Sequence, residues 1–185
     1  MDYKEGESLM LSDKTSEAID ILVGKCFDLN RTFDRAVSIL TNVFSMPQAA
    51  DIVHHKLAHL WPVIADEYSS FKDEWNITTY YPETHGDGRT YSNLQDMMET
   101  LLKETLEMYE MQKMAYSVAK ENGDLNACAF FMRMVRILTI VVGQVYTLRD
   151  KAEQMPNDYD SYDAHIDDWG IDGVDLTNPH VGSDD

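Results

Sequence analysis

Apolar residues recur at steps of three and four along most of the chain, a pattern typical of amphipathic α-helices. Four such stretches are separated by turn-forming residues and cover about residues 16–45, 47–75, 93–120 and 125–153. Pro47 stands in the first turn of the second stretch, where a proline is tolerated. The pattern therefore predicts an all-α protein with four long helices.

The lengths of the connections indicate how these helices are arranged. About three or four residues join the first helix to the second, and a link of the same length joins the third to the fourth. Links this short make each pair an antiparallel hairpin. The segment between the pairs, residues 76–92, has no helical period. It can extend to about 56 Å, more than the roughly 42 Å of the helix that follows. We therefore expect a ferritin-like four-helix bundle, with two hairpins joined by a long crossover, rather than a simple up-down-up-down bundle.

The end of the chain differs in character from the rest. After Pro156 the sequence contains nine Asp and neither Lys nor Arg, and it lacks helical periodicity. We therefore divide the chain into an N-terminal extension (residues 1–15), a helical bundle (residues 16–155) and an acidic tail (residues 156–185). The composition of the tail predicts that it is solvated and largely disordered.

Aromatic side chains within the tail favour a second interpretation. Tyr159, Tyr162 and Trp169 alternate with the aspartates, as in a docking peptide that attaches to its own bundle, to a neighbouring subunit or to another protein. Because the tail is strongly acidic, such a protein partner is expected to be basic.

The charge of the whole chain excludes two classes of partner. Its 15 Lys and Arg stand against 33 Asp and Glu, so the formal net charge is −18. Nucleic acid backbones and anionic membranes would repel this protein, whereas basic proteins and metal cations would be attracted to it. Half of the charge, −9, belongs to the acidic tail.

Other features of the sequence predict a cytoplasmic protein. The N-terminus is acidic and lacks the basic and apolar regions of a secretory signal. Cys26 and Cys128 lie about 100 residues apart among apolar neighbours, as expected for two thiols in a reducing compartment. The longest apolar run, residues 127–148, contains Arg133 and Arg136, which would be costly in a bilayer. We expect this run to form a buried helix.

The second predicted helix carries the richest set of metal ligands. On a helical wheel, His55, His59 and Asp66 fall together on the side opposite the apolar stripe, so they are expected to face outward. Two imidazoles four residues apart can share a divalent ion, and a second subunit can complete the coordination shell. The alternative is an exposed polar face that happens to be rich in histidine.

The interior offers a different set of polar groups. The apolar faces of the helices include Asn30, Thr105, Gln112 and Gln144, which are neutral amides and hydroxyls. A buried di-iron centre needs carboxylates and histidines at such positions. We therefore expect a buried hydrogen-bond network there instead.

Two strings of the sequence resemble the mini-ferritins, the Dps-type members of the ferritin-like superfamily. The segment from His55 to Tyr68 is similar to the start of their second helix, and the turn Glu121–Asp124 is similar to their last interhelical turn. The resemblance covers about residues 16–153. It implies a spherical oligomer, often a dodecamer, with an acidic interior that collects iron and a ferroxidase site between subunits. His55 and Asp66 can be carried over to that site.

The sequence departs from this family at the metal ligands. Pro62 replaces the first carboxylate of the second helix, while Arg35 and Pro47 occupy positions where histidines would donate. The resemblance therefore implies a degenerate ferroxidase site with weak or absent activity. The tails are acidic, so the DNA contact made by basic tails in this family is not expected.

These observations lead to two functional expectations. The first is a ferritin-like oligomer that binds or sequesters iron or another divalent metal through His55, His59 and Asp66. The second is a catalytically silent acidic binding or regulatory protein that acts through its surface and its tail and mimics the charge of nucleic acid.

Overall fold

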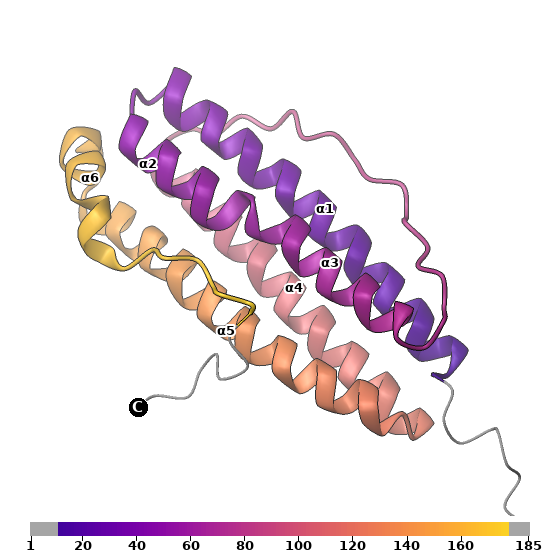
Figure 1. Ribbon diagram of the computed structural model, residues 1–185. Helices are drawn as coiled ribbons and strands as arrows, with labels where there is room; N and C mark the ends of the chain where they lie inside the picture. Colours follow the sequence, from indigo (N-terminus) through magenta and orange to yellow (C-terminus); the bar gives the residue numbers. More distant parts are fainter. Residues whose placement is uncertain (1–10, 178–185) are drawn as a thin grey trace, which may run out of the picture.

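The computed structural model describes residues 11–177, and all of their regular secondary structure is helical (Figure 1), which confirms the all-α class. Two helices, α1 (Asp13–Asn42) and α3 (Leu60–Asp73), form one side of the molecule, and the segment before α3 contains α2 (Pro47–Ile52) and the π-helical turn η1 (Val53–Ala58). The remaining elements are α4 (Leu94–Asn122), α5 (Leu125–Gln154), α6 (Tyr159–His165) and the 3-10 turn η2 (Ile166–Trp169).

The first helix begins three residues earlier than the predicted bundle. The side chain of Ser12 caps α1 by accepting a hydrogen bond from the Thr15 backbone N–H. Asp124, from the turn between α4 and α5, accepts hydrogen bonds from the hydroxyls of both residues. Because this carboxylate joins the start of α1 to the α4–α5 turn, part of the predicted N-terminal extension belongs to the helical body. Residues 1–10 lie outside the described part of the chain.

The second predicted helix is interrupted by a wide turn. Between α2 and α3 the backbone adopts a π-helical turn, in which the His59 N–H donates to the His54 carbonyl at 3.1 Å, five residues back. A π-helical turn adds a residue to the usual α-helical turn. A single α-helical wheel therefore cannot describe both ends of this segment.

The two hairpins are joined by an extended crossover, residues 74–93, which runs back along α1 (Figure 1). Residues spaced by four on α1 hold it in place. Asp20 accepts a hydrogen bond from the Tyr80 N–H at 3.0 Å, and Asp28 accepts one from the His85 N–H at 3.0 Å. Between them lies Gly24, where an added Cβ would come within 3.0 Å of the Pro82 ring. The crossover thus follows one stripe of α1.

Close backbone contacts join α1 to α3, α1 to α4, and α4 to α5, whereas α3 and α5 have few. Between α3 and α5 the interior is filled by side chains and by the C-terminal part of the chain. Residues 159–177, which we name the C-terminal strap, begin with α6 and η2 packed against α2, and their extended end enters this space (Figure 1).

The strap corrects the prediction of a solvated, disordered tail, which is wrong for residues 159–177. Tyr162 and Ile166 are fully buried, and the Tyr162 hydroxyl donates to the Leu148 carbonyl at 3.0 Å. Asp163 accepts a hydrogen bond from the Ala49 N–H at 2.7 Å, at the start of α2, which has no side-chain cap of its own. Apolar anchors and a helix cap thus outweigh the acidic composition on which the prediction rested.

The extended end of the strap is bound through its backbone. The Gln144 side-chain amide donates to the Gly173 carbonyl at 2.8 Å and accepts from the Gly173 N–H at 2.9 Å. Gly173 has φ +71°, and an added Cβ would lie 2.7 Å from the Lys56 carbonyl oxygen. Gln144, predicted to join a network in the core, therefore instead fixes the strap against η1. Residues 178–185 lie outside the described part of the chain.

Replacing Gly173 by Ala should release the strap. Both Gly173 and Gly170 have positive φ, but an added Cβ meets nothing within 4 Å at Gly170. We expect Gly170→Ala to cost about 1 kcal/mol of unfolding free energy from backbone strain alone, and Gly173→Ala about 2–4 kcal/mol, because the clash with the Lys56 carbonyl adds to the strain. Urea denaturation measures both, and limited proteolysis after Met155 reports release of the strap. Equal costs for the two variants would contradict this account of Gly173.

Candidate functional site

The wide turn η1 gathers three histidines. His54 and His59 are five residues apart, which would place them ~140° apart around an α-helix. In the π-helical turn they lie on the same side, and their ring centroids are 4.2 Å apart. The sequence analysis assigned only His55 and His59 to a site, because nothing in the periodicity signals a π-helical turn.

The three histidine rings lie close together on the surface. His55 lies 4.8 Å from His54 and 5.5 Å from His59 between ring centroids. Imidazoles that bind one ion with a metal to nitrogen distance of about 2.0–2.1 Å have centroids roughly 5 Å apart. Asp51, one turn earlier, has a carboxylate oxygen 3.4 Å from Nε2 of His55. Three imidazoles and one carboxylate thus share one surface of the molecule.

The donors need a small rearrangement to bind an ion. Within residues 11–177, no three His, Cys, Asp or Glu side chains are already arranged as a ligand set. The side chains of His55 and Asp51 are 55% and 72% exposed, so they can change rotamer without disturbing the core. A centre would therefore form by rotation of surface side chains and not by movement of the backbone.

Asp66 does not belong to this cluster. It is exposed on α3, seven residues beyond His59, which corresponds to roughly 10 Å along a helix axis. The helical wheel placed Asp66 at the same angle as the histidines but carries no information on axial distance. The structure therefore keeps His55 and His59 together, adds His54, and leaves Asp66 apart.

The interior does not fit a carboxylate-bridged di-iron centre. The Tyr68 hydroxyl donates to Gln112, whose amide donates to the Phe131 carbonyl at 3.3 Å, and Asn30 donates to the Ala58 carbonyl at 3.0 Å. Of the carboxylates in the described residues, only Asp163 is buried, and it caps α2. Of the four residues expected to form a neutral network, Gln112 and Asn30 make separate hydrogen bonds. Thr105 donates to the Leu101 carbonyl of its own helix, and Gln144 binds the strap.

The predicted partner-binding residues are engaged within the chain. Tyr159 packs against Phe44 with ring centroids 5.1 Å apart, and Trp169 lies edge-on to Tyr162 at 4.7 Å. Burial raises the pKa of the Tyr162 hydroxyl well above its ordinary value. Of the possibilities considered for the tail, attachment to its own bundle is therefore the one observed. For another protein to use these side chains, α6 would have to detach from the helical body.

The strap forms one wall of a cavity next to the histidines. This cavity, about 390 Å³ in volume, is lined by His55 and His59 on one side and by residues 172–177 of the strap on the other. Asp172 and Asp175 are among its lining residues and are exposed. The negative potential of these carboxylates favours the approach of a cation to the imidazoles.

A second group of charged residues, absent from the sequence prediction, lies where the crossover meets α1 and α4. Arg89 donates to Asp87 at 2.6 Å, to Glu104 at 3.0 Å and to the Thr32 hydroxyl at 2.7 Å. Lys25 completes the group by pairing with Glu104 at 2.8 Å. Arg89 and Asp87 belong to the crossover, whereas Thr32 belongs to α1 and Glu104 to α4. The group therefore fastens the crossover to these two helices, and we name it the clamp.

The clamp lowers the pKa of two carboxyls. Burial acts to raise the pKa of Asp87, but the hydrogen bonds and positive charge of Arg89 outweigh it, so the pKa lies below its ordinary value. Burial acts in the same way on Glu104, and there Lys25 and Arg89 lower the pKa. Both carboxyls are thus stabilised in the charged form by the fold.

One helix of the described residues, α5, is long and apolar enough to span a membrane by its length and composition, a test that the core helices of soluble proteins also pass. Its Phe131, Leu138 and Val145 side chains are fully buried in the helical body. Only 33% of its most apolar 18-residue stretch is buried, however, so one face of α5 lies in the core and the rest does not.

Comparison of the chain with known protein families and with curated proteins finds no match. The arrangement of the residues themselves therefore carries the functional argument.

Replacing Arg89 by Gln should change the response of the protein to acid. The ordinary pKa values of Asp87 and Glu104 are 3.8 and 4.5, and their folded-state values are lower. The stability that they supply is present above the ordinary values and is lost as the pH falls through the folded-state values. We expect the urea midpoint of the natural protein to fall between about pH 5 and 3, and that of Arg89→Gln to start lower and fall less. Arg136→Gln, on the exposed face of α5, is the control. Parallel pH curves for all three proteins would refute the clamp.

Proposed function

We propose that this chain is a ferritin-like helical protein that binds a divalent transition metal ion through His54, His55 and His59, with Asp51 as a further ligand. The observation that supports the proposal is the gathering of three imidazoles by η1, with ring centroids 4.2–5.5 Å apart. π-helical turns are rare and are frequently found at functional sites.

The donor set favours some metals over others. Imidazole suits Zn²⁺, Cu²⁺, Ni²⁺ and iron, and affinity for nitrogen ligands generally rises along the series from Mn²⁺ to Cu²⁺. Iron(II) stands near the weak end of that series, and the described interior supplies no carboxylate bridge for a pair of irons. We therefore infer a binding protein for late transition metals, with weak or absent ferroxidase activity.

The ferritin-like part of the proposal is supported by the chain path. A short link joins α1 to the segment α2–α3, and another joins α4 to α5, so each pair is a hairpin. The long crossover between the hairpins returns along α1 (Figure 1). An oligomer is also part of the proposal, since a second subunit could supply a ligand. Val63, 47% exposed beside His59 in the same cavity, offers apolar surface for such a contact.

Titration with Zn²⁺ tests the metal site. By isothermal calorimetry we expect one ion per chain, and at least about tenfold weaker binding for His54→Ala, His55→Ala and His59→Ala alike, because each removes a ligand. Asp66→Asn is the matched control on the same helix and should bind as the natural protein does. Affinity should be weaker in acid than at neutral pH, because protons compete with the ion for the imidazole nitrogens.

The same variants separate the present assignment from the triad predicted by the sequence. Loss of affinity in Asp66→Asn, with none in His54→Ala, would support His55, His59 and Asp66 and contradict the cluster. Unchanged affinity in all four variants would exclude both sites. Absence of Zn²⁺, Co²⁺ and Ni²⁺ binding to the natural protein would overturn the proposed function.

A further inference from the structure

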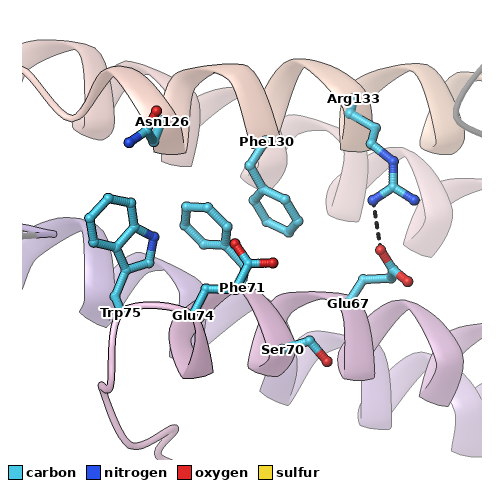
Figure 2. Close-up of a pocket in the computed structure, with 8 residues that line it drawn as sticks. All are labelled: Glu67, Ser70, Phe71, Glu74, Trp75, Asn126, Phe130 and Arg133. Carbon is cyan, nitrogen blue, oxygen red and sulfur yellow. Dashed lines mark hydrogen bonds and ion pairs between the residues drawn. The ribbon is translucent and has the colours of Figure 1, made fainter.

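The space between α3 and α5 is a groove that the strap fills only in part. Residues 170–177 of the strap occupy the half next to η1, and the Arg133 guanidinium donates to the carbonyl of Leu176 at 2.7 Å. Beyond Arg133 the groove continues as a pocket of about 410 Å³ (Figure 2). The two halves therefore meet at a single arginine, which also pairs with Glu67 at 2.6 Å.

The occupied half shows how the groove holds an extended chain. Side chains of α5 bind the strap backbone, since Gln144 pairs with both polar groups of Gly173 and Arg133 donates to Leu176. The apolar side chains of Ile171 and Leu176 are buried, at 5% and 7% exposure. Backbone hydrogen bonds from side chains, combined with apolar anchors, are the means by which proteins bind extended peptides.

The open half has a different lining, suited to a cation. Phe71 and Phe130 stack with ring centroids 4.3 Å apart and an angle of 6° between the rings, and the Trp75 indole lies at one end of the pocket (Figure 2). Glu67 and Glu74 line the same pocket on the α3 side. Aromatic rings attract ammonium and guanidinium groups, and Trp does so most strongly. Glu67 is already paired with Arg133, so Glu74 is the carboxylate beside the rings that adds direct charge attraction.

The Trp75 indole has a buried Nε1 atom with no hydrogen-bond partner within the described residues. A buried N–H without a partner is costly, so a rotation of the indole that brought this N–H to a bound peptide carbonyl would be favoured.

We propose that the open half of the groove, between α3 and α5, binds an extended basic segment of another protein, with a Lys or Arg side chain placed against Trp75 and Phe130 and paired with Glu74. The net charge of −18 draws such a segment to the chain. The sequence that follows Thr177 has two Asp and neither Lys nor Arg, so charge does not favour it as the occupant. The inference is independent of the metal site, because it uses none of the histidines.

A fluorescein-labelled peptide of alternating Gly and Arg, titrated with the full chain, tests this proposal by fluorescence anisotropy. We expect Glu74→Gln and Trp75→Leu each to weaken binding at least about threefold, through loss of the ion pair and of the indole face. Glu83→Gln removes the same charge from the exposed crossover and should change affinity less. In NMR spectra the indole N–H of Trp75 should shift on binding, whereas those of Trp61 and Trp169 should not.

Several results would overturn the proposal. The proposal fails if the Gly-Arg peptide does not bind, or if a peptide of alternating Gly and Glu binds with the same affinity. It also fails if Glu83→Gln weakens binding as much as Glu74→Gln does, because that would indicate attraction to the overall charge alone. Free arginine that shifts the Trp75 signal with the affinity of the peptide would identify a small-cation site instead. Glu74 is exposed, so its variant keeps the test decisive even where Trp75→Leu lowers stability.

Discussion

The separation of α3 from α5 is the constraint on which the rest of the structure depends. The other neighbouring long helices touch closely, but these two leave a space that must be filled, because an empty apolar groove forfeits both burial and dispersion contacts. At one end the aromatic rings of Tyr68, Phe71 and Phe130 fill part of it and leave the open half of the groove. At the other end the strap does so. The order of the C-terminal segment thus follows from helix spacing and not from its own propensity.

The π-helical turn links the strap to the histidines. Gly173 approaches the Lys56 carbonyl more closely than any side chain would permit, and Lys56 lies between His55 and His59 in the chain. The same turn that presents the imidazoles therefore also provides the backbone surface on which the strap rests. A change in the conformation of η1 would therefore displace Gly173, so the histidine cluster and the end of the strap are structurally coupled.

The sequence predicts the helices well and the surface poorly, for physical reasons. Amphipathic periodicity reports which face of a helix is buried, and connection length limits where the chain can go next, so the helix positions and the crossover could be expected. A wheel assumes one uniform helix, which is why it missed His54 and included Asp66. Nothing in a local pattern shows that Gln144 and Arg133 would bind the backbone of the strap.

The acidic tail illustrates a limit of reasoning from composition. Seven aspartates lie between Asn157 and Thr177, and all but Asp163 are exposed. High charge argues for disorder only where apolar residues are too few to offset the entropy of ordering. Here Tyr162, Ile166 and Ile171 meet a groove that needs filling, so a few apolar side chains decide the outcome while the carboxylates stay in water. Folding the segment back does not neutralise its charge. It places two of the six exposed carboxylates, Asp172 and Asp175, beside His55 and His59, where their charge favours the approach of a cation to the imidazoles.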